Sequence, residues 1–283
     1  MTILSNVDIE KEIGLSIAIY PFYKQNLRGA NYNLTVSKLA WNLETKQSIY
    51  DLNTNKITIA KGSTALIQTN EAVWVSSRIA GTYHSKVALV SKGLSHIGTT
   101  LDPEYIGVSL ITVHNYGSED IILSAEKDTF VTLMFYYVAT EASIQQGSNL
   151  PGKREVLQGF TVTPDENNWL DEDFRNIPSQ LKNKLNECPD FKVVIKKRKL
   201  ESEKIKTEEE RKLEFERKQR RSTIKYTSSL FVFFLLMVVL LYLSFNKDKL
   251  VKTSWYDLAV NSVYTVLFVI PASLLAKAFN DLK

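Results

Sequence analysis

The sequence predicts a mainly β N-terminal half, then a charged helical stalk, and then two transmembrane helices. Three observations on the 283-residue chain lead to this fold class. Residues 1–140 contain many short runs of β-branched and aromatic residues, about 8 to 12 residues apart and broken by Gly, Asn, Asp or Ser. Residues 192–225 are dense in Lys, Arg and Glu, and residues 226–245 contain no charged side chain.

The β-strands are expected where these runs lie between turn residues. No long helical pattern separates them, which is typical of an all-β barrel or jelly roll. The expected strands are SIAIY, YNLTVSKLAW, KITIAKG, STALIQTN, VWVSSRIAG, VSLITVHN, DIILSA and TFVTLMFYYV. A first helix is expected at residues 6–14, where Asn6 would cap the N-terminus and Gly14 would end the helix.

The amino-acid composition excludes several kinds of chemistry. The single cysteine, Cys188, excludes an internal disulfide framework and a multi-cysteine metal site. The three histidines lie in different segments, so no dedicated metal site is predicted. The net charge of +4 is a local feature, because residues 192–225 hold 14 Lys or Arg against 7 Asp or Glu. The remainder is slightly acidic, and we expect no nucleic-acid partner.

Residues 141–191 are expected to form a polar excursion followed by an amphipathic segment. WLDEDFRNIPSQLKNKL predicts one helix or a helix pair interrupted at Pro178. FKVVI, residues 191–195, has the composition of a β-strand. The basic stalk at 192–225 contains strong helix formers and few apolar residues. It is either a solvated charged helix or a helix that bundles in an oligomer and transmits motion to a membrane.

Two apolar segments predict a transmembrane hairpin. Residues 226–245 would span roughly 30 Å at about 1.5 Å per residue, which is the thickness of the bilayer hydrocarbon. Residues 255–276 are less apolar, but their length and the Trp and Tyr at their edge predict a second span. Asp257 and Asn261 share one helical face. This face either meets other helices or water, or Asp257 simply lies at the level of the headgroups.

The distribution of Lys and Arg predicts the orientation in the membrane. Lys218, Arg220 and Arg221 precede the first span, whereas the connecting loop has three Lys partly offset by Asp248. The positive-inside rule then places the N-terminal domain and the C-terminus in the cytoplasm, with the chain multi-pass in the inner membrane. The opening MTILSNVDIEKEIG has acidic residues where a signal peptide needs basic ones, so no signal peptide is predicted.

The stretch GTTLDPEYIGVSL, residues 98–110, contains the first candidate ligand residues. Asp102 precedes a proline, Tyr105 follows three residues later, and Gly107 would let the backbone bend sharply. An acid, an aromatic ring and a glycine held between two strands are typical of a binding loop. The alternative is an ordinary Asp-Pro turn, with Tyr105 packed inside the barrel.

These motifs, in this order, resemble the dUTPase and dCTP deaminase superfamily over residues 1–140. The opening LSNVDIEKEIGLSIAIYPFYKQNLRGANYNLTVSKLAW is similar to the start of dCTP deaminases, and IAGTYHSKVALVSKGLSHIGTTLDPEYIGVSL to the superfamily core. The resemblance implies a dUTPase-like distorted jelly-roll barrel that forms a homotrimer with nucleotide sites between subunits. It also implies that Asp102 contacts the deoxyribose and that Tyr105 packs against the sugar.

The segment HSKVALVSKGL takes the place of the phosphate-handling helix in this resemblance. His84, Ser85 and Lys86 stand where the family carries an Arg-Ser-Ser-type signature. Ser85 and Lys86, with backbone N–H groups at a helix N-terminus, would hold an anionic ligand. A bound nucleotide phosphate would imply Mg²⁺ as cofactor.

Two departures from the family pattern argue against deamination. Thr112 occupies the position of the catalytic glutamate of the deaminases, and a hydroxyl cannot act as a general base near neutral pH. Asn33 replaces an early aspartate. Asp102 remains, so diphosphate hydrolysis is the enzymatic alternative.

The sequence therefore predicts a membrane effector without catalysis. Its cytoplasmic barrel would bind a nucleotide or a nucleotide-derived second messenger and control a membrane-disrupting or pore-forming helix hairpin. The architecture is similar to that of bacterial anti-phage effectors that join a nucleotide-sensing domain to two transmembrane helices, which is an analogy of layout. The alternatives are a membrane-tethered deoxynucleotide hydrolase that uses Asp102, and a scaffold whose barrel only trimerises.

Overall fold

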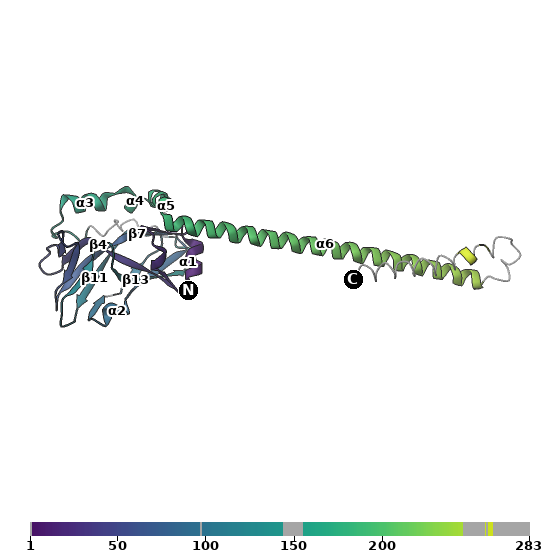
Figure 1. The fold of residues 1–283 in the computed structure, drawn as a ribbon, viewed down its shortest axis with the longest axis horizontal. Helices are drawn as coiled ribbons and strands as arrows, with labels where there is room; N and C mark the ends of the chain where they lie inside the picture. The colour runs from purple at the N-terminus through teal and green to yellow at the C-terminus, as the bar shows by residue number, and fades with distance from the viewer. Residues whose placement is uncertain (1, 97, 144–154, 246–257, 259, 263–283) are drawn as a thin grey trace. The chain divides into compact units, whose positions relative to one another are not determined.

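The computed structural model divides the chain into two compact units, Met1–Glu201 and Ser202–Lys283 (Figure 1). It describes residues 2–96, 98–143, 155–245, 258 and 260–262. The first unit is mainly β, and the described part of the second is almost entirely helical. The mainly β prediction for the N-terminal part and the helical prediction for the stalk are confirmed.

Most of the first unit is a curled ten-stranded sheet, accompanied by a three-stranded sheet. The strands are β1 (Thr2–Ile3), β2 (Ile17–Tyr20), β3 (Leu27–Arg28), β4 (Asn31–Asn42), β5 (Tyr50–Asp51), β6 (Lys56–Ile59), β7 (Thr64–Val75), β8 (Ile79–Ser85), β9 (Leu94–His96), β10 (Thr100–Leu101), β11 (Ile106–Asn115), β12 (Ile121–Ser124) and β13 (Thr129–Tyr137). The large sheet has the order β10-β8-β13-β4-β7-β11-β9, and β1, β2 and β3 pair with β13, β7 and β4. The small sheet has the order β12-β6-β5.

Strand β4 joins the two halves of the large sheet. Its residues 32–35 pair with β13, whereas residues 36–42 pair with β7. The register shifts between Val36 and Ala40, and such an irregularity bends a strand and lets it pass between two parts of a sheet. Most β4 side chains are buried on both faces, which explains why YNLTVSKLAW is a nearly continuous apolar run.

Short helices precede and follow the strands. They are α1 (Asn6–Glu12), the 3₁₀ turn η1 (Lys24–Asn26), α2 (Val87–Val90), α3 (Pro164–Asp171), α4 (Asp173–Asn176), α5 (Pro178–Glu187) and the long α6 (Pro189–Phe245). Helix α4 ends before Pro178, which begins α5, so the predicted interruption at this proline is confirmed. Leu181 and Leu185 of α5 are fully buried and belong to the same hydrophobic core as the strands.

Arg175 holds the helical segment α3–α5 to strand β7. Its guanidinium lies 3.5 Å from the ring centre of Trp169 and 4.5 Å from that of Phe174. Its Nη1 donates to the carbonyl oxygen of Asn70 in β7 at 3.3 Å, and its Nη2 pairs with Glu172 at 3.1 Å. Burial of such a charge requires these partners, because an unpaired charge in the interior is strongly destabilising.

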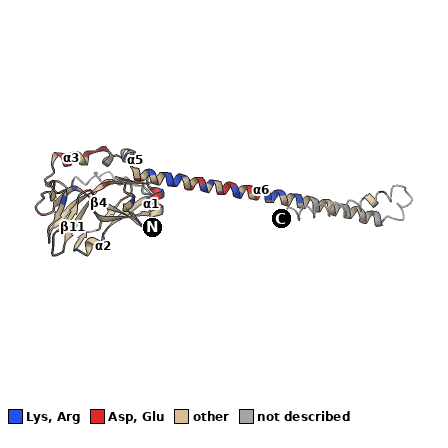
Figure 2. Cartoon of the chain, viewed as in Figure 1, with Lys and Arg blue, Asp and Glu red and all other residues tan. Residues whose placement is uncertain are grey.

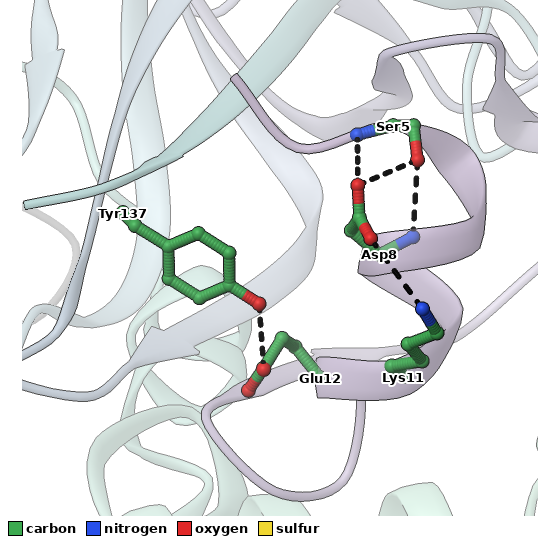
Figure 3. Close-up of polar contacts among 5 residues, drawn as sticks. All are labelled: Ser5, Asp8, Lys11, Glu12 and Tyr137. Carbon is green, nitrogen blue, oxygen red and sulfur yellow. Dashed lines mark hydrogen bonds and ion pairs between the residues drawn. The ribbon is translucent and has the colours of Figure 1, made fainter. Parts of the chain in front are cut away.

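Two local predictions, for the cap of α1 and for the strands around residues 70–73, need correction. Helix α1 is capped by Ser5 and not by Asn6: Ser5 Oγ accepts the N–H of Asp8 at 3.2 Å, and Asp8 Oδ2 accepts the N–H of Ser5 at 3.1 Å (Figure 3). This reciprocal capping box satisfies two free N–H groups, which a cap at Asn6 would not do. The predicted strands STALIQTN and VWVSSRIAG are not separated by a turn. Strand β7 instead continues through Asn70 and Glu71 to Val75.

The strand prediction for FKVVI is also wrong, because these residues lie in α6. Pro189 begins the helix, where its missing N–H costs nothing. Phe191 and Val194 are buried whereas Val193 is exposed, which is the three-residue period of a helix face. A five-residue apolar run cannot distinguish the two periods by itself.

The start of α6 is clamped to α1 within the first unit. Phe191 packs against Gly14, whose φ is +84° and where an added Cβ would lie 2.5 Å from Phe191 Cζ. Lys197 Nζ donates to Glu10 Oε2 at 2.8 Å, and Arg198 Nη2 donates to the carbonyl oxygen of Ile13. We call these contacts the α1–α6 clamp.

Helix α1 is tied to the sheet as well as to α6. The hydroxyl of Tyr137, at the end of β13, donates to Glu12 Oε1 at 2.7 Å (Figure 3). Burial raises the pKa of Tyr137 to about 12, and the neighbouring Glu12 carboxylate acts in the same direction. The phenol therefore stays a hydrogen-bond donor at physiological pH, and α1 connects β13 with α6.

Apart from residues 258 and 260–262, the described part of the second unit is the remainder of α6 from Ser202. Its charged residues follow one another along the helix until about residue 225, after which Figure 2 shows no Lys, Arg, Asp or Glu up to Phe245. Within the described residues, one helix, α6, is long and apolar enough to cross a membrane. The predicted second span, 255–276, lies outside the described residues apart from Leu258 and 260–262. Asp257 is among those not described, and Asn261 lies in helical conformation.

Glu71 is a carboxyl group buried inside β7. It is fully buried, and it accepts hydrogen bonds from the N–H and the hydroxyl of Thr35 in β4, both at 2.8 Å. Burial raises its pKa from 4.5 to about 8, in spite of these two donors. The group keeps its proton in the folded protein at a pH where the unfolded chain has lost it.

We expect this shift to make stability depend on pH. Because the folded-state pKa is raised, the contribution of Glu71 is fully present below about pH 4.5 and is lost as the pH rises through about 8. The loss is on the order of 5 kcal/mol. Urea unfolding of the full-length chain, followed by tryptophan fluorescence, to which the buried Trp41 contributes, measures it. Glu71→Gln should remove this part of the pH dependence, and an unchanged slope in that variant would contradict the assignment.

The α1–α6 clamp leads to a second prediction. Gly14→Ala should destabilise the first unit by about 2 kcal/mol or more, because alanine is strained at positive φ and its methyl group meets Phe191. Gly62→Ala is the matched control, since Gly62 also has positive φ (+69°) but no atom lies within 4 Å of its added Cβ. In a double-mutant cycle, Gly14→Ala with Phe191→Ala should cost less than the sum of the single changes. Equal losses for Gly14→Ala and Gly62→Ala would refute the packing role.

Candidate functional site

The residues His84, Ser85 and Lys86 lie where β8 ends and α2 begins. His84 is exposed, and its Nε2 shares a hydrogen bond with Thr82 Oγ1 at 2.7 Å. Across the sheet His84 stands in register with Thr132 of β13, which in turn stands opposite Asn33 of β4. Thr132 Oγ1 donates to Asn33 Oδ1 at 2.8 Å. The structure thus places two of the positions that depart from the family pattern, Asn33 and His84, in one row of the sheet.

Ser85 is paired with a histidine that the sequence did not single out. Its Oγ and Nδ1 of His96 share a hydrogen bond at 2.6 Å, and the main-chain N–H of His96 also approaches this oxygen, at 3.4 Å. Burial lowers the pKa of His96, so the ring is neutral near pH 7. Its Nε2 is buried and has no hydrogen-bond partner among the described atoms. The two residues meet because α2 turns the chain back from β8, where Ser85 ends the strand, to β9, where His96 lies.

Lys86 is half-buried and lies on the wall of a cavity of about 780 Å³. Its Nζ donates to Thr129 Oγ1 at the start of β13. Burial lowers the pKa of Lys86, and the nearby Arg28 lowers it further. An anionic ligand in the cavity would reverse this effect, because a negative charge near an amine favours its protonated form.

The cavity lies between α2, the β11–β12 connection and the start of β13. It is lined by Lys86, Ala88, Leu89, residues 91–93, residues 117–123, Asp128 and Thr129. Gly93 has φ +92° and its Cα faces the backbone of Gly117 so closely that no Cβ would fit at either position. Two cations, Lys86 and Lys92, face the cavity from the α2 side.

Three acidic residues, Glu119, Asp120 and Asp128, also line the cavity, and two of them hold its loops in place. Asp120 Oδ1 accepts the N–H of Lys61 at 2.9 Å, and Asp128 Oδ2 accepts that of Ser124 at 2.7 Å. In the part of the chain that the structure describes, no three His, Cys, Asp or Glu side chains form a group that could hold a metal ion. A magnesium ion would therefore need phosphate and water oxygens as most of its ligands.

Asp102 and Tyr105 lie in a turn at the other end of β8. Thr100 Oγ1 donates to Asp102 Oδ1 at 3.3 Å, and the N–H of Tyr105 donates to the carbonyl oxygen of Asp102 at 3.2 Å. Glu104, between them, has φ +62°, and Gly107 has φ +133° at the start of β11. The Asp102 side chain is partly exposed, so it can contact a ligand.

Tyr105 points into the core of its own subunit. Its side chain is buried, its hydroxyl donates to the carbonyl oxygen of Val108 at 2.6 Å, and burial raises its pKa. The nearby Tyr83 hydroxyl shares a hydrogen bond with Ser109 in the same buried region. These contacts favour the packing alternative for Tyr105, and its role against a sugar stays a prediction.

Within one chain the two groups of candidate residues lie apart. Leu101 pairs with Gly81 of β8, and Ser85 follows four residues later on that strand. At about 3.3 Å per residue, Asp102 and Ser85 are roughly 13 Å or more apart along β8. Thr112 lies on β11 opposite Leu66 of β7, next to Val113, which pairs with His96 of the Ser85 contact. A single copy of the chain therefore does not bring Asp102 together with Ser85 and Lys86.

Known proteins that are similar to this chain are found among solved structures. A scan of protein-family models finds no match, and a search of curated proteins finds no match either. Solved dCTP deaminases and dUTPases are similar to this chain. The deaminase from Agrobacterium tumefaciens is 11% identical with a TM-score of 0.40, and the match covers 48% of each chain.

Two dUTPases give similar values. The EIAV dUTPase is 20% identical with a TM-score of 0.33, and the match covers 47% of this chain and 98% of that one. The dUTPase from phage phi11 of S. aureus is 13% identical with a TM-score of 0.33, and the match covers 46% of this chain and 95% of that one. The chain thus spans about half the length of the deaminase and nearly all of these two dUTPases.

Proposed function

We propose that this protein is a membrane-anchored receptor for a phosphate-bearing nucleotide that binds its ligand without converting it. The observation that carries the proposal is the cavity of about 780 Å³ with Lys86 and Lys92 on its wall. Two amines beside backbone N–H groups are suited to a phosphate chain. Thr112, in the position of the deaminase glutamate, supplies no general base.

The receptor would be a homotrimer, with sites completed between subunits. The separation of Asp102 from Ser85 and Lys86 within one chain supports this proposal, because a nucleotide could meet both groups only where two subunits adjoin. Asp102 would then face the sugar of a nucleotide whose phosphates lie near Lys86 of the next subunit. These phosphates would bring the bound Mg²⁺ with them.

Occupancy would be passed to the membrane through the α1–α6 clamp. The contacts Tyr137–Glu12, Lys197–Glu10 and Phe191–Gly14 join β13, α1 and α6 in one chain of packed groups. We propose that 226–245 and 255–276 form an inner-membrane hairpin that opens a pore or disrupts the bilayer, as a defence against phage. The N-terminal domain and the C-terminus would be cytoplasmic.

One observation favours a second candidate, a membrane-tethered deoxynucleotide hydrolase. Asp102 is a partly exposed carboxylate at the tip of a turn, which is suitable for orienting an attacking water molecule. This function would use the same ligands, and it differs from the receptor only in turnover.

Nucleotide binding and turnover separate these functions. For the purified full-length chain with Mg²⁺, we expect dUTP or dCTP to raise the melting temperature without release of product. Lys86→Gln should weaken binding by about tenfold through the loss of a charged donor. Lys56→Gln, on β6 outside the cavity, is the matched control. Turnover that Asp102→Asn abolishes would establish the hydrolase, and the absence of binding by any nucleotide would leave only a scaffold.

The membrane role leads to a separate prediction. Phe234 lies near the middle of the apolar stretch, and a lysine there should cost about 3 kcal/mol of insertion. Phe234→Lys should release the chain from membranes during alkaline carbonate extraction and relieve any growth defect caused by expression. Phe215→Lys, in the charged part of α6, should behave like the unchanged chain. Equal growth and equal membrane integrity with and without Phe234→Lys would exclude the pore.

A further inference from the structure

From Ser202 onward, the charged part of α6 consists of a mixed, net acidic stretch followed by a purely basic one. Residues 202–216 contain four Lys or Arg and six Glu, whereas residues 217–225 contain five Lys or Arg and no acidic residue. We call the second stretch the basic segment; it comprises Arg217, Lys218, Arg220, Arg221 and Lys225. All five side chains are exposed along the helix, and Figure 2 shows them as the last blue positions before the uncharged stretch.

The basic segment directly adjoins the apolar stretch of α6. Tyr226 follows Lys225, and from there to Phe245 no residue carries a charge. The described side chains of this stretch are exposed, including Phe231, Phe234 and Leu241. An exposed apolar helix of this length needs a lipid environment, so the basic segment falls at the level of the headgroups on one side of the bilayer.

The hydroxyl groups at this boundary are already satisfied by their own helix. Thr223 Oγ1 donates to the carbonyl oxygen of Gln219 at 3.0 Å, and Thr227 Oγ1 to that of Thr223 at 3.0 Å. Ser228 Oγ donates to the carbonyl oxygen of Lys225 at 2.9 Å. Such internal bonds remove the need for water where a helix enters hydrocarbon. Thr207 makes the same bond to the carbonyl oxygen of Glu203 in the charged part of α6, so these bonds are compatible with the boundary and the charge pattern locates it.

We propose that the basic segment binds the phosphate groups of anionic phospholipids. Nine helical residues cover roughly 13 Å, which is enough to reach through the headgroup layer, and the long Lys and Arg side chains extend this reach. Each of the three arginines can donate to two phosphate oxygens from its planar fork. Nucleic acid is a less suitable partner, because the segment lies beside the lipid phosphates. The proposal rests on the membrane anchoring proposed above.

The lipid that co-purifies with the full-length chain tests this inference. The chain is extracted from bacterial membranes in a zwitterionic detergent, and its bound phospholipids are measured by mass spectrometry. In one variant Arg217, Lys218, Arg220 and Arg221 become Gln. In the matched control Lys204, Lys206, Arg211 and Lys212 become Gln, which removes the same number of charges from the net acidic stretch of the helix.

We expect anionic phospholipids to be enriched over their share of the membrane. The enrichment should fall by about threefold or more in the first variant, persist in the control, and weaken in about 0.5 M salt for the unchanged chain. A third variant with Arg217, Arg220 and Arg221 changed to Lys keeps the charge and should keep the enrichment; loss in that variant, with the helix intact by circular dichroism, would contradict an electrostatic surface.

The remaining outcomes separate this inference from the anchoring itself. Bound phospholipid with the same anionic share as the membrane would overturn the headgroup inference and leave the anchoring intact. No bound phospholipid at all would overturn both. Co-purification of nucleic acid, seen as ultraviolet absorbance of the bases and lost only in the first variant, would replace the lipid by a nucleic-acid partner.

Discussion

The contact between Phe191 and Gly14 is the constraint on which the connection of the two parts of the molecule depends. A ring fits there only because residue 14 has no side chain, and the chain can turn there only because glycine accepts φ +84°. With this contact, the first turns of α6 belong to the hydrophobic core of the β-rich unit. The contacts of Lys197 with Glu10 and of Arg198 with the carbonyl oxygen of Ile13 add to it, but Phe191 is the largest apolar group that this part of α6 buries.

The sequence predicted the strands well where apolar runs are long and turn residues are clear. β4, β11 and β13 fall where YNLTVSKLAW, VSLITVHN and TFVTLMFYYV predict them. The interruption expected between residues 70 and 73 is wrong for a physical reason. Polar residues in a strand resemble a turn, but here Glu71 bonds to Thr35 of the neighbouring strand, and Arg175 bonds to the main chain of Asn70. A partner more than thirty residues away cannot be read from local composition.

The candidate site shows the same division between local and long-range information. Asp102, Ser85 and Lys86 can be proposed from motif order, because each motif is contiguous. The contact of His96 with Ser85 could not be proposed, because it depends on how the chain turns back through α2 from β8 to β9. The burial of Tyr105 depends on which face of the turn packs against the core, and residue spacing does not predict that face. The separation of Asp102 from Ser85 is a matter of strand register, which the sequence does not specify.

The register of β8 also determines which candidate ligand residues lie nearer to α1 and α6. Ile79 of β8 pairs with Tyr137, whose hydroxyl holds Glu12 of α1, whereas Ser85 pairs with Val131 at the far end of β13. Leu101, next to Asp102, pairs with Gly81, close to the Tyr137 end. A ligand shifts a conformational equilibrium only by the difference in its affinity for the two states. In the proposed receptor, contacts at Asp102 would therefore lie closer to the Tyr137–Glu12 contact, and so to α1 and α6, than contacts at Lys86 would.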